Sequence, residues 1–241
     1  MNRRVLASVL VLAAACADNR SSIEIDGRAA PSDAKACEFA PGGKNVLGPG
    51  LLDVRSMTPS YSLVLYVKNN LSKPTAAAQP VTGQIPMVTD ASKVWTANAA
   101  RVRINPSDYV DAYAPNPALL DFQGENTLPL DGQPVQPGGG TAAQYVEAVS
   151  GPLGALLVGK VTPGDLKRVI LGITLKGQSN DGASVDSGEW YFPLDLCNGC
   201  LVAETPTCGT GQVLTRTSCF ATLPDYNNQD TPPICAAPAT Q

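Results

Sequence analysis

The sequence RVILGITLKG, residues 168–177, alternates between apolar side chains on one side and mostly polar or small ones on the other. A period of two residues predicts a strand with one buried face. The segment VDSGEWYFPLDL, residues 185–196, continues this alternation in its second half, and the turn residues Asn180, Asp181 and Gly182 separate the two segments. Such residues accept the positive φ angles of tight turns, so the region predicts a β-hairpin. Its buried face comprises Val169, Leu171, Ile173, Leu175, Trp190, Phe192, Leu194 and Leu196.

Two earlier segments predict further strands. The segment Tyr61–Asn69 is apolar on both faces, which indicates a central strand of its sheet. Within residues 93–105, basic Arg101 and Arg103 alternate with Val102 and Ile104, as in a half-exposed strand. The two arginines are expected on its solvated face, with a binding role as the alternative.

The remaining segments predict little regular structure. Residues 106–140 are rich in Pro, Asn, Gly and Asp, and we expect irregular loops with at most a short strand. Residues 141–158 allow a helix that Gly151 and Pro152 must break. Strands joined by turns, without helices alternating between them, predict a mainly β fold. We expect an antiparallel β-sandwich, immunoglobulin- or fibronectin-like in general form.

The composition limits the possible functions. The chain has 241 residues, of which 44% are hydrophobic, and its net charge is −4. The acidic balance argues against a nucleic-acid partner, which would favour a basic face. The chain contains no histidine, which removes Ser-His-Asp and Cys-His catalysis and every histidine-containing metal site. We therefore expect a protein that is not an enzyme.

The N-terminus has the layout of a secretory signal peptide. Basic Arg3 and Arg4 precede a short apolar run, Val5 to Leu12, and three alanines lead to Cys16. The alanines followed by a cysteine resemble the lipobox of bacterial lipoproteins. This resemblance implies cleavage of residues 1–15, lipidation of Cys16 and anchoring in a membrane. Ala17 then favours the outer membrane, because an aspartate at this position retains enteric lipoproteins in the inner membrane.

The mature chain divides into three expected parts. Residues 16–36 are polar and predict a lipidated, flexible tether. The β-sandwich domain is expected over residues 37–200, and residues 201–241 form a cysteine-rich, disulfide-stapled C-terminal extension.

Six cysteines remain in the exported chain after Cys16. An even number in an oxidising compartment predicts structural disulfides. The pairing that closes the shortest loops, and gives the distant Cys37 a partner, is Cys37–Cys197, Cys200–Cys208 and Cys219–Cys235, with a Cys197–Cys200 bond as its main rival.

Four other chemical roles are less favoured than these structural ones. Cys197-Asn198-Gly199-Cys200 is a C-x-x-C motif, but the helix and βαβ context of a thioredoxin-like enzyme do not accompany it. A four-cysteine zinc site is disfavoured outside the cytoplasm. Residues 225–230 resemble a calcium loop only in composition, because the Gly and Glu of an EF-hand are missing. Asp181, Asp186 and Glu189 are expected to be solvated residues near the hairpin turn rather than a catalytic pair. We therefore expect no catalytic residue, cofactor or metal site.

The stretch WYFPLDLCNGCLV, residues 190–202, with the spaced cysteines that follow it, resembles a group of uncharacterised cysteine-rich lipoproteins of myxobacterial type. This resemblance supports export and lipidation, and it implies no activity for any residue.

Together these features predict an exported lipoprotein of the outer membrane, on its periplasmic or its surface face. It would act as a non-enzymatic structural or interaction module, with the membrane and an unidentified protein or glycan as partners. One alternative is a glycan- or peptide-binding lipoprotein that uses the loops around Tyr109, Tyr113 and Phe122. The second is a periplasmic thiol oxidoreductase that uses Cys197 and Cys200.

Overall fold

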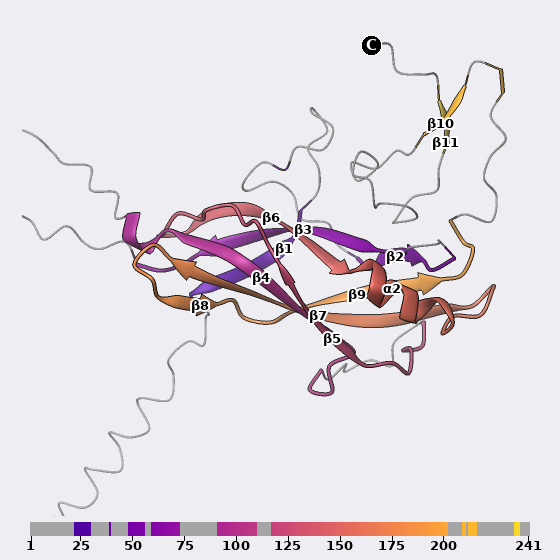
Figure 1. The fold of residues 1–241 in the computed structure, drawn as a ribbon, viewed down its shortest axis with the longest axis horizontal. Coiled ribbons are helices and arrows are strands. Elements are labelled where there is room, and N and C mark those ends of the chain that lie inside the picture. The colour runs from indigo at the N-terminus through magenta and orange to yellow at the C-terminus, as the bar shows by residue number, and fades with distance from the viewer. Residues whose placement is uncertain are drawn as a thin grey trace, which may run out of the picture.

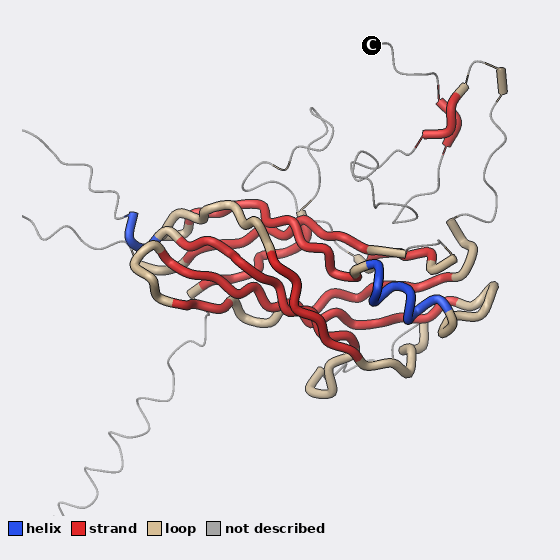
Figure 2. The backbone as a smooth tube through the Cα atoms, in the orientation of Figure 1, coloured by secondary structure: helices blue, strands red, loops and turns tan. Residues whose placement is uncertain are grey.

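The computed structural model describes residues 22–29, 39, 48–55, 59–72, 91–109, 117–201, 209–210, 212–215 and 234–236. Of these residues, 53% are in strands and 8% are helical, so the prediction of a mainly β fold is confirmed. Apart from a two-stranded pair near the C-terminus, the described strands form two packed sheets that do not close into a barrel (Figures 1 and 2).

The smaller sheet has three antiparallel strands in the order β1-β3-β6. They are β1 (Ile23–Arg28), β3 (Tyr61–Asn69) and β6 (Gly140–Val149). The predicted strand β3 is central, as expected, and is buried on both faces. On the outer face, Val64 and Tyr66 pack with Ala29 and Phe39 in a small second apolar cluster.

The larger sheet has the order β2-β9-β7-β4-β5. Its strands are β2 (Gly50–Asp53), β9 (Trp190–Cys197), β7 (Leu166–Ser179), β4 (Trp95–Ile104) and β5 (Gly124–Pro129). A short strand, β8 (Ser184–Asp186), pairs with β7 after the predicted turn, in which Gly182 has a φ of 86°. The predicted hairpin is therefore confirmed, and its return arm is divided into β8 and β9.

The main core lies between the two sheets. The side chains of Val169, Leu171, Ile173 and Leu175 on β7 are fully buried there, as the alternation predicts. Each large aliphatic side chain removed from water contributes about 1.5–3 kcal/mol. The strand orders β1-β3-β6 and β9-β7-β4-β5 correspond to strands A-B-E and G-F-C-C′ of the immunoglobulin-type Greek key, which agrees with the predicted sandwich.

One strand pair departs from the predicted antiparallel pattern. β2 runs parallel to β9, with Gly50 opposite Leu194 and Asp53 opposite Cys197. These strands are far apart in sequence and no hairpin joins them, so nothing local requires them to be antiparallel. The four-residue segment Gly50–Asp53 is also too short to show a clear period.

The predicted tether over residues 16–36 is wrong for residues 23–29. Ile23 and Ile25 of β1 are core residues, whereas Glu24 and Asp26, which alternate with them, are exposed. Arg28 at the end of β1 is also buried, and its guanidinium carbon lies 5.7 Å from the centroid of the Phe192 ring. The alternation in this polar segment is only four residues long, and it becomes stable through pairing with β3.

The prediction of a broken helix over residues 141–158 is also wrong. Residues 140–149 form β6, and only α2 (Gly151–Val158) is helical. Pro152 lies in the first turn of α2, where its missing N–H interrupts no helical hydrogen bond. Proline therefore begins this helix instead of breaking it.

The predicted C-terminal extension contains a pair of short strands. β10 (Val213–Thr215) pairs antiparallel with β11 (Ile234–Ala236), which contains Cys235. The predicted signal peptide, Cys16, Cys37, Cys208 and Cys219 lie outside the described residues.

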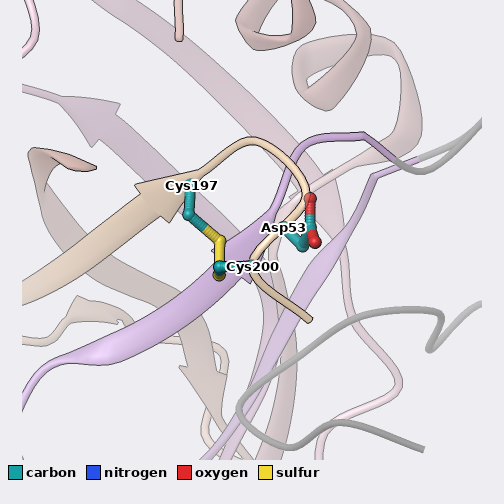
Figure 3. A group of neighbouring side chains, drawn as sticks. All are labelled: Asp53, Cys197 and Cys200. Carbon is teal, nitrogen blue, oxygen red and sulfur yellow. A yellow bond between two sulfur atoms is a disulfide. The ribbon is translucent and has the colours of Figure 1, made fainter. Parts of the chain in front are cut away.

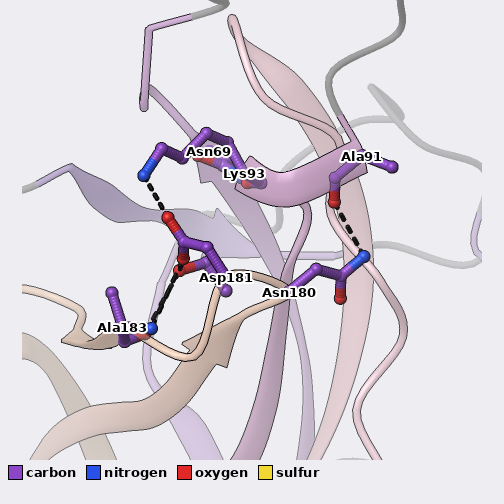
Figure 4. A network of polar contacts seen from close by, with 7 residues as sticks. Asn69, Ala91, Lys93, Asn180, Asp181 and Ala183 are labelled. Carbon is purple, nitrogen blue, oxygen red and sulfur yellow. Dashed lines mark hydrogen bonds and ion pairs between the residues drawn. The ribbon is translucent and has the colours of Figure 1, made fainter.

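A polar network fixes the β7–β8 turn to the start of β4 (Figure 4). The Asn180 side chain donates a hydrogen bond to the carbonyl of Ala91 at 2.7 Å. Asp181 forms an ion pair with Lys93 of the short 3-10 helix η1 (Ala91–Lys93). Asn69 of β3 donates to the carbonyl of Lys93 at 2.9 Å, so the network links both sheets.

We expect this network to weaken in acid. The hydrogen bond from Lys93, followed by that from Ser179, lowers the pKa of Asp181 to about 2. The unfolded value is about 3.9, so the interaction stabilises the fold above about pH 4 and is lost as the pH falls towards 2. The melting temperature of wild type should therefore fall more between pH 5 and pH 2 than that of Asp181→Asn. The exposed Asp165→Asn is the control, and an acid response of Asp181→Asn equal to that of wild type would contradict the prediction.

Glycine is required at one position of α2. A Cβ atom on Gly154 would lie 1.7 Å from the backbone carbonyl oxygen of Pro59, whereas one on Gly151 of the same helix would meet nothing within 4 Å. We expect Gly154→Ala to lower the free energy of unfolding by about 1–3 kcal/mol, the usual cost of overpacking. Gly151→Ala should be neutral or slightly stabilising. Urea denaturation of the two variants checks the difference, and equal midpoints would show that Gly154 does not pack against Pro59.

Candidate functional site

A polar cleft of about 220 Å³ opens where β4 ends and β5 begins. Its two walls are the end of β4 with the following turn and the segment that leads into β5. The lining residues are Arg103, Ile104, Asn105, Pro106, Ser107, Gln123, Gly124 and Glu125.

Asn105 shapes the wall of this cleft. It has a φ of 45°, a left-handed conformation that residues other than glycine adopt at an energetic cost. Its side-chain amide donates to the carbonyls of Leu120 and Phe122 at 2.8 and 2.9 Å, and its side-chain oxygen accepts the N–H of Ile170 at 2.7 Å. These bonds join the end of β4 to Leu120 and Phe122 and to Ile170 of β7, and they compensate for the backbone conformation.

Arg103 fastens the turn after β4 to the sheet. Its Nε atom donates to Glu189 Oε1 at 2.7 Å, and its Nη1 atom lies 3.0 Å from Asp108 Oδ1. The hydrogen bonds from Arg103 lower the pKa of both carboxyl groups, and the two carboxylates raise the pKa of the guanidinium. All three groups are therefore held firmly in their charged forms near neutral pH.

Two tyrosines lie beside Arg103, Asp108 and Glu189 on the outer face of the larger sheet. The Tyr191 hydroxyl donates to Glu189 Oε2 at 3.0 Å, and its ring centroid lies 5.0 Å from that of Tyr109. Burial, and then the bond to Glu189, raises the pKa of the Tyr191 hydroxyl. Gly172 leaves room for this arrangement, because a Cβ atom there would lie 2.5 Å from Glu189 Oε1.

Three polar side chains of the cleft remain uncommitted. Within the described part of the chain, the side chains of Ser107, Gln123 and Glu125 form no hydrogen bond or ion pair, and all three are exposed. They offer a hydroxyl, an amide and a carboxylate to a ligand.

The sequence prediction located this site only in part. Tyr109 of the predicted loop belongs to it, whereas Phe122 is half-buried, packs against the core and has the Lys160 ammonium 5.9 Å from its ring centroid. Tyr113 lies outside the described residues. Arg103, expected to be simply solvated, is the central charged group, and its partner Glu189 comes from 86 residues further along the chain.

The second candidate site is the bond between Cys197 and Cys200 at the end of β9. This bond excludes the predicted pairs Cys37–Cys197 and Cys200–Cys208, which are wrong, and the rival pairing of the two neighbours is correct. The turn between them lets two cysteines three residues apart bring their Cα atoms to 5.8 Å, within the range for a disulfide. The Cys197 side chain is buried, and that of Cys200 is exposed.

The buried Asp53 carboxylate organises the turn that carries this disulfide (Figure 3). Its Oδ1 atom accepts the N–H of Gly199 at 2.8 Å, and Oδ2 accepts that of Leu201 at 2.8 Å. The parallel pairing of β2 with β9 brings Asp53 opposite Cys197, so these hydrogen bonds depend on a strand pair that the sequence did not predict.

This site also brings together three potential metal ligands. One ligand atom from each of Asp53, Cys197 and Cys200 lies within 4.8 Å of the others. The two sulfurs are bonded to each other, and zinc requires thiolates, so the oxidised pair does not suit a metal ion.

The three acidic residues near the predicted hairpin turn each pair with a different basic residue. Asp181 pairs with Lys93, Glu189 pairs with Arg103, and Asp186 Oδ2 lies 3.9 Å from Lys176 Nζ. The predicted lipidation site Cys16 and the calcium-like stretch 225–230 lie outside the described residues, and only the backbone of Cys235 is described.

No protein-family model matches the chain, and neither the curated proteins nor the solved structures contain a significant match to it. Among the described residues, no helix is both long and apolar enough to cross a membrane.

Proposed function

We propose that this protein is a non-enzymatic interaction module of the bacterial cell envelope, tethered to the outer membrane through lipidated Cys16. The cleft beside Arg103 is its binding surface. The observation that supports this role is the pre-arranged wall of the cleft, in which Arg103 pairs with both Asp108 and Glu189 and is held in place by them. The pKa shifts of both carboxyl groups are downward, which keeps them ionised and suits binding better than proton transfer at neutral pH.

The position of the cleft along the molecule also supports an interaction role. The strand β1 begins at Ile23, which lies opposite Asn69, and Asn69 bonds to Lys93 just before β4. Asn105 lies at the other end of β4, a strand of ten residues that spans about 30 Å. A body anchored through its N-terminal end would therefore carry the cleft on the part furthest from its anchor.

The second candidate function is thiol–disulfide exchange by Cys197 and Cys200. It is favoured by the bond between these two neighbours and by the exposure of Cys200, which an incoming thiolate could attack. The buried carboxylate of Asp53 opposes this function, because a thiolate released beside a negative charge is destabilised. We therefore place it second and interpret the disulfide as a structural closure of the turn.

The lipid anchor is tested with the full chain expressed in a Gram-negative bacterium. Wild type should sediment with membranes and take up a fatty-acid probe, because the probe is attached through Cys16. Cys16→Ser should be unlabelled and released from the membrane fraction, and Cys200→Ser is the matched cysteine control that keeps the label. An unlabelled Cys16→Ser protein that stays on membranes in high salt would refute the anchor.

The two interpretations of the disulfide differ in reduction potential. A structural disulfide beside Asp53 should stay oxidised in glutathione buffers down to about −300 mV, whereas catalytic pairs are reduced at roughly −120 to −270 mV. Alkylation and mass spectrometry of the equilibrated full chain measure this. Asp53→Asn should make reduction easier by removing the charge, with the exposed Asp165→Asn as control. A wild-type midpoint in the catalytic range would favour the oxidoreductase.

A further inference from the structure

We propose that the cleft beside Arg103 binds a neutral, hydroxyl-rich oligosaccharide. This inference rests on the proposed function, since it takes the cleft as the binding surface and names the class of ligand. Four features of the site carry it: its charge balance, its uncommitted polar groups, its aromatic pair and its extent across the sheet.

The charge balance of the site disfavours an anionic ligand. The Arg103 guanidinium is already shared between Glu189 and Asp108, so its donors are engaged. Glu125 adds a carboxylate to the cleft wall that has no cationic partner within the described residues. Arg101, two residues before Arg103 on β4, adds a second basic group, but these two arginines face the three carboxylates of Asp108, Glu125 and Glu189. A phosphate or carboxylate ligand would therefore meet a net negative charge.

The uncommitted groups suit hydroxyl groups of a ligand. A sugar hydroxyl both donates and accepts hydrogen bonds, and it is best matched by a site that offers both functions. The Glu125 carboxylate accepts, whereas the Gln123 amide and the Ser107 hydroxyl can each donate and accept. Recognition of a cationic peptide would favour several free carboxylates, but two of the three here are bound to Arg103.

The aromatic pair supplies an apolar surface next to these polar groups. Tyr109 and Tyr191 are half-buried, and their rings stand at 55° to one another on the outer face of the sheet. The C–H face of a sugar ring packs on such aromatic surfaces, while its hydroxyl groups remain free for the polar wall. The Asp108 carboxylate joins the two regions, because it lies next to Tyr109 in sequence and pairs with Arg103.

The strand register determines how far the surface extends. Glu125 lies opposite Arg103, Arg103 opposite Gly172, and Gly172 opposite Tyr191. Three inter-strand spacings of about 4.8 Å place the ends of this row roughly 14 Å apart. The row is longer than one sugar ring, so we infer an oligosaccharide and not a monosaccharide.

The experiment uses the full chain, purified in detergent, on an array of neutral and acidic oligosaccharides. At least one neutral oligosaccharide should bind, and calorimetry with that probe should give a dissociation constant that Tyr109→Ala weakens by about tenfold. Glu125→Ala should weaken binding to a similar degree. Tyr145→Ala is the matched control, because Tyr145 is an exposed tyrosine on β6 of the other sheet, and its affinity should equal that of wild type.

Several outcomes overturn the proposal. These are an array without neutral binders, binding of acidic oligosaccharides only, and binding of a tetralysine probe while no neutral oligosaccharide binds. An affinity that Tyr109→Ala and Glu125→Ala leave unchanged would also refute it, because binding would then lie elsewhere. Thermal denaturation of each variant separates loss of binding from loss of folding, and Gln123→Ala replaces any variant that fails to fold. A negative array refutes the class of ligand alone, because labelling of Cys16 is measured independently.

Discussion

The two-residue alternation of β7 is the constraint on which both the core and the candidate site depend. Its inward residues Val169, Leu171, Ile173 and Leu175 are fully buried against the smaller sheet, so the strand cannot shift its register by one residue without exposing all of them. The same register turns Gly172 outward, between Arg103 of β4 and Tyr191 of β9. The absence of a side chain there lets the Glu189 carboxylate lie over the sheet and reach Arg103. Burial of the inner face of β7 thus fixes the position of the Arg103–Glu189 ion pair on its outer face.

The start of β7, where Leu166 lies opposite Cys197 of β9, depends on a different interaction, a buried charge satisfied by hydrogen bonds from the backbone. Desolvating the Asp53 carboxylate is costly unless hydrogen bonds replace its water. The N–H groups of Arg55, Gly199 and Leu201 provide these bonds. The Gly199 backbone has a φ of 91°, which suits glycine and helps to bring its N–H to the carboxylate. The disulfide closes only a short loop, so its entropic stabilisation is about 2 kcal/mol in the chain-entropy model. The hydrogen bonds of Asp53 are therefore as important as the covalent bond at this edge.

Long strands with a clear apolar pattern were predictable from sequence, whereas short strands and non-local contacts were not. The strand Tyr61–Asn69 is a long apolar run and the β7–β9 hairpin has a two-residue period, so their positions and buried faces follow from the local sequence. β1 and β2 are short, and they become strands only through pairing with β3 and β9. For the site, the loop containing Tyr109 was predictable from its composition. The Arg103–Glu189 pair was not, because its partners are 86 residues apart and meet only through the register of three strands. The Cys197–Cys200 pairing depended likewise on a turn that Asp53 shapes from another strand.

The short distance between Cys16 and Ile23 changes how the proposed anchor would present the cleft. Because β1 begins at Ile23, only seven residue steps separate it from Cys16, and they reach at most about 25 Å. A lipidated Cys16 would thus hold the N-terminal end of the sandwich close to the lipid headgroups. A long flexible tether, in contrast, would allow any orientation. β4 then becomes the spacer, because its roughly 30 Å separate Lys93 at the anchored end from Asn105 at the cleft. An acidic chain would be repelled by anionic lipids, which further favours an upright body. In this arrangement the rigidity of the sandwich, and not the length of a linker, determines how far from the membrane the ligand is met.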